Sequence, residues 1–82
     1  MMQTLSYPVV LYPDPDAQGV FIVEAPDLPG LATEGATIDE ALAAAREAVT
    51  LYLEELQRRG EPPPQPGSRG PVVLGSVTVK VA

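Results

Sequence analysis

The chain has 82 residues, with 11 acidic and 5 basic side chains and a net charge of −6. This length predicts one domain over 1–82 that buries only about 60% of its unfolded surface, so we expect association with a second copy or a partner to add stability. The acidic balance opposes direct binding of nucleic acid. The chain has no cysteine and no stretch near the roughly 18 apolar residues of a membrane span, which predicts a soluble cytoplasmic protein without a membrane partner.

The N-terminal part of the sequence predicts an antiparallel meander of three short strands. Residues 5–12 are rich in β-branched and aromatic side chains, and Pro8 among them favours an edge position. Pro, Asp and Gly in 13–19 predict a tight connection, so 20–25 should return as a second strand. Residues 31–34 predict a third strand, after which Gly35 should release the chain.

A hard turn is expected between the second and third strands, where residues 25–31 read Ala-Pro-Asp-Leu-Pro-Gly-Leu. Asp27 is expected to fix this corner by accepting hydrogen bonds from nearby backbone amides. Pro29 and Gly30 complete the turn, and Gly30 should adopt a positive φ. These residues are therefore interpreted as structural.

A long helix is predicted over Ile38–Arg59. Thr37 and Glu40 form a capping box, in which each side chain can accept a hydrogen bond from the other residue's backbone N–H. Basic residues followed by Gly60 predict the helix end, because glycine readily takes the left-handed capping conformation. Three- and four-residue spacing predicts one apolar stripe along this helix: Ile38, Leu42, Ala45, Val49, Tyr52, Leu53 and Leu56.

The predicted helix is longer than the sheet beneath it. A helix of this length spans about 33 Å, whereas strands of about six residues span roughly 20 Å. The last apolar residues should then extend past the sheet and form a subunit or partner interface. This predicted interface comprises Tyr52, Leu53, Leu56, Glu54 and Glu55. The alternative is that the following segment folds back over these side chains.

Residues 61–71 are rich in proline and predict an extended spacer. Residues 72–82 alternate β-branched and polar side chains, which predicts a C-terminal strand with a possible bend at Gly75. The predicted fold class is therefore α+β, with the order β-β-β-α-β. The C-terminal strand could pair within its own subunit or with a neighbour.

The acidic residues are also candidate metal ligands. A two-metal nuclease needs several carboxylates that converge, and the candidates would be Asp14, Asp16, Glu24, Asp27 and Glu34. The net charge and the absence of histidine oppose this chemistry. The stretch 14–19 resembles the start of a calcium loop, but Ala25 stands where that loop requires an acid. We therefore expect no catalytic residue, no metal and no cofactor.

Several of these segments together resemble the HicB-like antitoxins of bacterial HicA/HicB toxin–antitoxin pairs. The resemblance rests on the strand at 20–23, the Pro-Asp-Leu-Pro-Gly corner at 26–30, Thr-Glu-Gly at 33–35 and the Thr-Ile-Asp-Glu-Ala-Leu helix start at 37–42. It implies a partial ribonuclease H-like fold. It also implies assembly into a dimer or tetramer and a small basic HicA-like partner, a toxin that cleaves RNA.

The resemblance implies a protein-binding module rather than an enzyme. An acidic surface would attract the basic toxin and cover its working face. The candidate contacts are Asp14, Asp16, Glu24, Glu34, Glu54 and Glu55, each of which could equally be an ordinary surface residue. Members of the family commonly continue into a DNA-binding domain, which we do not expect after the β-rich tail. A small oligomeric regulatory or scaffold protein without a toxin partner is the alternative function.

Overall fold

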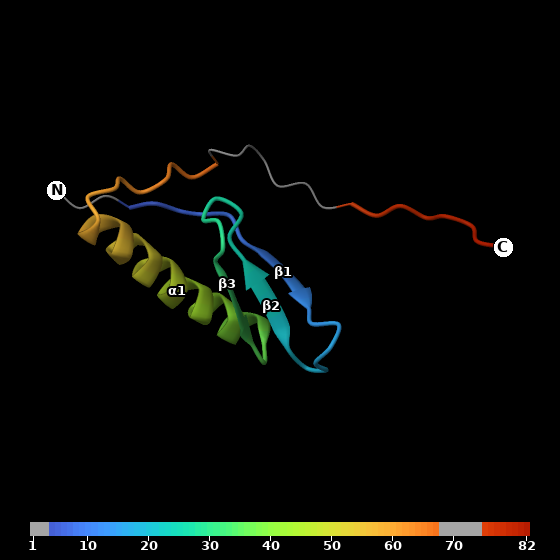
Figure 1. Ribbon diagram of the computed structural model, residues 1–82. Coiled ribbons are helices and arrows are strands. Elements are labelled where there is room, and N and C mark those ends of the chain that lie inside the picture. The colour runs from blue at the N-terminus through green and yellow to red at the C-terminus, as the bar shows by residue number, and fades with distance from the viewer. Residues whose placement is uncertain (1–3, 68–74) are drawn as a thin grey trace.

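The computed structural model describes residues 4–67 and 75–82, in which three strands precede one helix. The strands β1 (Val10–Pro13), β2 (Phe21–Glu24) and β3 (Ala32–Gly35) form an antiparallel sheet in the order β1-β2-β3. The helix α1 (Ile38–Arg58) follows β3 directly (Figure 1). The predicted meander and helix are confirmed, and they make the described body of the molecule an α+β fold.

The first two strands are shorter than the sequence predicted, and β3 has the predicted length but is shifted by one residue. Val10 pairs with Glu24 and Pro13 with Phe21, while Phe21 pairs with Gly35 on the other side of β2. The first strand begins at Val10 because the chain after Glu24 turns into the corner, which leaves residues 5–9 without a ladder partner. Gly35 is part of β3, so the expectation that it lies beyond the strand is wrong.

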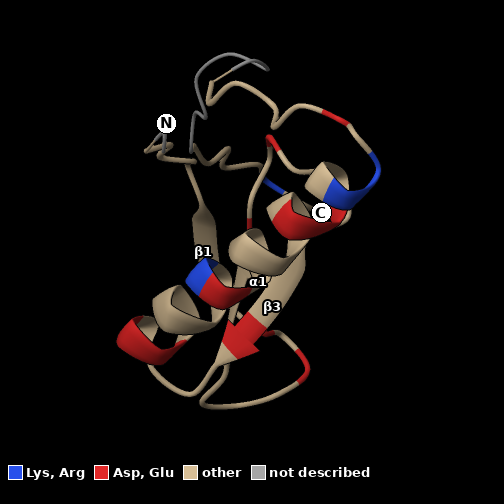
Figure 2. Ribbon diagram, turned by 90° about the vertical axis from the view of Figure 1, so that its left-hand side faces the viewer, with Lys and Arg blue, Asp and Glu red and all other residues tan. Residues whose placement is uncertain are grey.

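One face of the sheet is covered by α1 (Figure 2). Val23 is fully buried against Ala41 and Ala45 of the helix, and Leu11 and Phe21 pack around this cluster. Alternate side chains of a strand point to opposite faces, so the remaining strand positions face away from α1. The two small alanines let the helix approach the sheet closely.

Both ends of α1 are capped by backbone and side-chain hydrogen bonds. The Thr37 hydroxyl accepts a hydrogen bond from the Glu40 amide at 3.0 Å, as predicted. The Glu40 carboxylate accepts from the Ala36 amide at 3.1 Å instead of from Thr37, so the expected reciprocal box is shifted by one residue. At the other end Gly60 has φ 73° and the Glu61 amide donates to the Leu56 carbonyl, which is the Schellman arrangement.

The buried stripe of α1 differs from the predicted stripe in its first two turns. Ala41 is fully buried, whereas Ile38 and Leu42 are 53% and 41% exposed. The prediction was based on large apolar residues. The small Ala41 is buried instead, because only a small side chain fits where the helix lies closest to the sheet. Ala45 and Leu56 are buried, as expected for their positions.

The second half of α1 packs on the corner between β2 and β3. Leu28 is fully buried there, and Tyr52 and Leu53 pack against it together with Val49. Gly30 has φ 85°, as predicted, and the Tyr52 hydroxyl donates to the Pro29 carbonyl at 3.3 Å. The corner therefore extends the surface on which the helix rests beyond the end of the sheet.

The proline-rich segment returns along the body as far as Gly67. The Tyr7 hydroxyl donates to the Pro64 carbonyl at 2.6 Å, and the Gly67 amide donates to Asp27 Oδ2 at 2.6 Å. Asp27 is 3% exposed. The expectation that Asp27 bonds amides of its own corner is therefore wrong, because its carboxylate binds a segment forty residues away.

The predicted C-terminal strand is not seen in residues 75–82. These residues are extended and exposed, and they form no strand ladder with the sheet. They lead away from the body (Figure 1). A strand is stabilised by pairing with a neighbour, and the described part of this chain supplies none at that place. Residues 72–74 of the prediction lie outside the described residues.

Candidate functional site

The face of the sheet opposite α1 is open, and we call it the open sheet face. It carries the alternate side chains that point away from the core. Glu24, Ala32 and Glu34 are exposed, and Val10, Tyr12 and Ile22 are half-buried. Its members are Val10, Tyr12, Ile22, Glu24, Ala32 and Glu34. This face therefore combines an apolar patch with two carboxylates.

Cross-strand pairing sets the positions of these groups. Ile22 lies between Tyr12 on one side and Glu34 on the other. The Tyr12 hydroxyl donates to Glu24 Oε1 at 3.0 Å. This hydrogen bond, together with burial, raises the pKa of Tyr12 above its ordinary value of 10.0. The phenol thus stays protonated at neutral pH and holds the Glu24 carboxylate in place on the face.

The connection between β1 and β2 adds two more acidic residues at the rim. Asp14 Oδ1 accepts a hydrogen bond from the Asp16 amide at 2.8 Å, and the Asp14 amide donates to the Val20 carbonyl. Asp14, Ile22 and Glu34 line a hollow of about 430 Å³. Asp14 and Asp16 thus lie in a turn, as expected. This turn also places Asp14 at the same hollow as Glu34.

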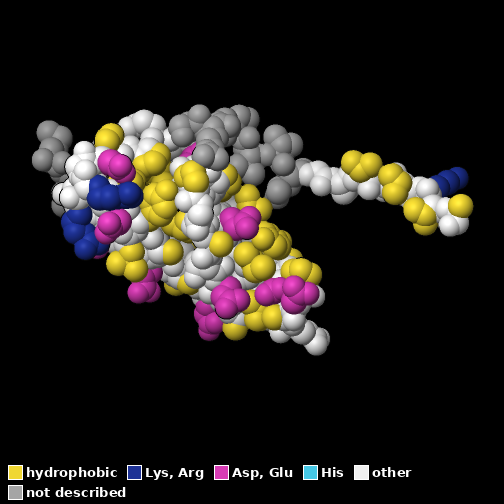
Figure 3. All heavy atoms as spheres, in the orientation of Figure 1, with side chains coloured by type: hydrophobic (Ala, Val, Ile, Leu, Met, Phe, Trp, Pro, Cys, Tyr) yellow, Lys and Arg dark blue, Asp and Glu magenta, His cyan; other side chains and the backbone are white. Residues whose placement is uncertain are grey.

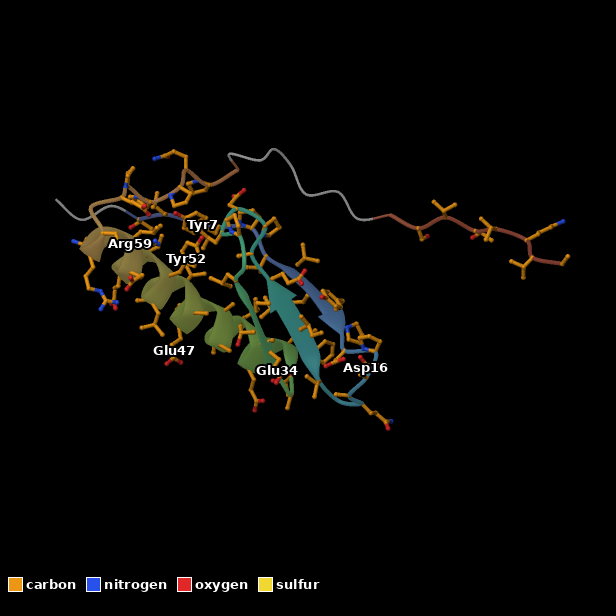
Figure 4. All side chains as sticks on the ribbon, in the orientation of Figure 1. Tyr7, Asp16, Glu34, Glu47, Tyr52 and Arg59 are labelled. Carbon is orange, nitrogen blue, oxygen red and sulfur yellow. The ribbon has the colours of Figure 1, made fainter. Side chains whose placement is uncertain are left out.

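Positive charge lies away from the open sheet face. The basic residues in the described part of the chain lie on or beside α1 and in the tail: Arg46, Arg58, Arg59 and Lys80. Figure 3 shows basic side chains at one end of the body and at the tail tip, while acidic ones are spread over the rest. Figure 4 places Asp16 and Glu34 far from Arg59. A basic partner would meet least repulsion at the open sheet face.

The helix-end candidates have different surroundings. Leu56 is 8% exposed, and Tyr52 and Leu53 are half-buried within their own chain. Glu55 forms ion pairs with Arg58 at 2.5 Å and with Arg59 at 3.9 Å. Glu54 is exposed. The corner cluster of Ala25, Leu28 and Leu31 thus covers part of Tyr52 and Leu53, and the interface at this end stays a prediction.

The carboxylates that were candidate metal ligands do not lie around a common point. Within residues 4–67 and 75–82, no three acidic side chains lie close enough together to hold a metal ion. Glu24 is engaged by Tyr12 and Asp27 by the Gly67 amide. The arrangement offers recognition by charge and shape.

A groove on the helix side of β1 was not foreseen from the sequence. It has a volume of about 520 Å³ and lies between residues 5–9 and one side of α1. Leu5 and Val9 line one wall, and Leu42, Val49 and Leu53 line the other. The signal that could have revealed it is the apolar alternation of 5–11, which implies a face pointing toward the helix.

Tyr7 is a further residue whose role the sequence did not indicate. Its ring packs with the corner cluster and its hydroxyl binds the spacer (Figure 4). Burial, with a smaller contribution from the Asp27 charge, raises the pKa of Tyr7 above 10.0. Tyr7 and Asp27 together hold residues 64–67 on the body.

The described residues include no helix with both the length and the apolar character needed to cross a membrane.

The sheet, the corner and the capped helix lie in the part of the chain that matches a family of known proteins. Residues 7–72 match the family described as "HicB_like antitoxin of bacterial toxin-antitoxin system". The chain belongs to this family of antitoxins.

Relatives of similar size occur in archaea and cyanobacteria. A UPF0150 protein of Thermoplasma acidophilum is 38% identical over 61 residues, which cover 74% of this chain and 86% of the relative. A UPF0150 protein of Archaeoglobus fulgidus is 36% identical over 50 residues, which cover 61% and 70%. One from Synechocystis sp. is 35% identical over 57 residues, which cover 70% and 75%. The similarity thus spans most of each chain.

Proposed function

We propose that this chain neutralises a small basic RNA-cleaving toxin by binding it on the open sheet face. The family match implies a toxin partner, and the exposed Glu24 and Glu34 beside an apolar patch are the observation that supports this surface. Asp14 and Asp16 extend the negative charge along its rim. Neutralisation of this kind needs no catalysis, since an occupied toxin surface cannot reach RNA.

The open sheet face is favoured over the helix end for two reasons. No ion pair within the described residues engages Glu24 or Glu34, whereas Glu55 already pairs with two arginines. Tyr52 and Leu53 at the helix end already pack against the corner cluster, while no helix of the described residues covers the open sheet face. A partner would therefore gain both charge pairing and apolar burial on the sheet.

The test first asks whether a neighbouring gene encodes a small basic protein, and then co-expresses and purifies that protein with this chain. We expect relief of its growth arrest and a complex whose affinity falls with added salt. The double variant Glu24→Lys/Glu34→Lys should weaken binding roughly 10- to 100-fold in titration calorimetry, because two attractive contacts become repulsive. Circular dichroism verifies that the variant folds.

The matched control is Glu47→Lys/Glu54→Lys, which makes the same charge change at exposed positions of α1. Its affinity should stay within a few-fold of the wild type. Equal losses in both variants would show that net charge alone matters and would reject the open sheet face. Failure of any small basic neighbour to bind would reject the toxin partner and favour the regulatory or scaffold function.

A further inference from the structure

The edge of β1 is unpaired in the described part of the chain. Its sheet ends at β1, and β2 occupies only one side. The Asp14 amide donates to the Val20 carbonyl opposite it, and bonded positions alternate along an antiparallel pair. Val9 and Leu11 therefore direct their backbone groups away from β2. Pro13 has the same orientation, so its missing N–H removes no hydrogen bond from the ladder between β1 and β2.

The groove lies beside the start of this edge, on the helix side of residues 5–9 that lead into β1. Side chains of a strand added beside β1 would alternate between the groove and the open sheet face. Most of the groove lining is apolar, with Val9 on the strand side and Leu42 and Val49 on α1, while Arg46, Thr50 and Ser6 are its polar members. Leu42 is 41% exposed as it stands. An added strand must therefore carry apolar residues at every second position.

The tail of this same chain has that pattern. Val77, Val79 and Val81 alternate with Ser76, Thr78 and Lys80. The three valines are 88%, 72% and 88% exposed. With the valines in the groove, Lys80 would lie on the side of the open sheet face, near the acidic residues Glu24 and Asp14. The alternating pattern, the valines and the charge of residues 76–81 thus match the edge of β1, the groove and the acidic residues beside them.

We infer that residues 76–81 of a second copy add a strand to the free edge of β1 and fill the groove. The tail leads away from its own sheet (Figure 1), while the spacer before it is held on the body at Pro64 and Gly67. A tail directed outward in this way reaches a neighbouring molecule without rearrangement of the body. Reciprocal exchange between two chains fills both grooves and closes the assembly. This inference is independent of the proposed toxin.

The first experiment measures mass by sedimentation velocity over a range of concentrations. The full chain should have twice the 8.6 kDa of one chain. Val77→Asp/Val79→Asp should raise the dimer dissociation constant at least ~100-fold, because two carboxylates would lose water against a mainly apolar lining, which one exposed Arg46 does not offset. Ser76→Asp/Thr78→Asp, on the opposite side of the tail, is the matched control. It should raise the dissociation constant far less than Val77→Asp/Val79→Asp, because repulsion from Glu24 and Asp14 at an exposed face is screened by solvent.

The second experiment distinguishes exchange from pairing within one chain. The protein has no cysteine, so introduced ones react cleanly. Chains with Val10→Cys or Tyr12→Cys, mixed with chains carrying Thr78→Cys, should form an interchain disulfide. Ala43→Cys on the exposed side of α1, mixed with Thr78→Cys, should not.

Three results would overturn the inference. They are a monomer at all concentrations, a dimer that survives Val77→Asp/Val79→Asp, and an absence of interchain disulfides with both edge positions. A disulfide that forms only when both cysteines are in one chain would assign the groove to that chain's own tail.

Discussion

Gly35 has a packing constraint that no other glycine of residues 4–67 and 75–82 has. A Cβ atom built there would lie 2.7 Å from the Glu40 carbonyl carbon and closer still to the Ala41 amide nitrogen. Both neighbours are backbone atoms of the first helical turn and cannot swing aside. The end of β3 thus touches the start of α1, which sets the distance between sheet and helix.

Gly35→Ala is therefore expected to destabilise the fold by about 1–3 kcal/mol, the range for overpacking a tight site. The control is Gly75→Ala, where the added atom meets nothing within 4 Å. Urea denaturation followed by circular dichroism measures both. Equal midpoints for the two variants would contradict the close contact.

At the scale of elements, the helix was well predicted from sequence and the lengths of the first two strands were not. Thr37, Gly60 and the acidic first turn mark the ends of α1 locally, and the structure confirms both within one residue. The strands end where their ladder partners turn away, a property of two segments together. Sequence periodicity in 5–12 therefore could not reveal that only Val10–Pro13 is paired.

Two leucines in the second half of α1 differ in burial, and their alanine variants test which side of the helix is covered. Leu56 is 8% exposed and Leu51 is 58% exposed. Leu56→Ala should lower the free energy of unfolding by about 2–5 kcal/mol, since it leaves a cavity. Leu51→Ala should change it by roughly 0.5 kcal/mol or less.

Chemical denaturation of the two variants gives the comparison. Leu56→Met, which conserves volume, should restore most of the loss. A large effect of Leu51→Ala at a concentration where the chain is dimeric would instead place Leu51 in a subunit contact. Equal effects of the two alanine variants in the monomer would contradict the burial described for Leu56.

At the scale of the whole molecule, Tyr7 and Asp27 join the N-terminal segment, the corner and the spacer. The raised pKa of Tyr7 means that the folded state retains the phenolic proton above pH 10.0, where the unfolded chain releases it. Its stabilising contribution is therefore fully present below pH 10 and is lost as the pH rises through the folded-state pKa.

Urea denaturation between pH 8 and 11.5 tests this contribution. Tyr7→Phe should be less stable than the wild type at pH 8 by about 0.5–1.5 kcal/mol, the net value of one hydrogen bond. The difference in the free energy of unfolding between the two proteins should become smaller above pH 10, because the wild type then loses this hydrogen bond. Leu51→Ala, which removes no ionisable group and lies at a position that is 58% exposed, controls for general alkaline effects. A constant gap between wild type and Tyr7→Phe would contradict the assignment.

The candidate site was predicted in part from single residues. Glu24 and Glu34 were among the acidic candidates, but their shared face with Val10, Tyr12 and Ile22 depends on the register of the sheet. Asp27 was assigned to its own corner because local turns commonly use aspartate in this way. Its partner Gly67 is forty residues away, beyond any local pattern.

The sequence by itself determined the order of strands and helix, the capped ends of α1, the conformation of the corner and the acidic character of the chain. These properties depend on local hydrogen bonding, on backbone preference and on the count of charges. Only the tertiary structure decided which face of the sheet is open, which helix side chains are buried and where the spacer binds. Those outcomes depend on which distant segments come into contact, because burial and pairing are properties of the assembled surfaces.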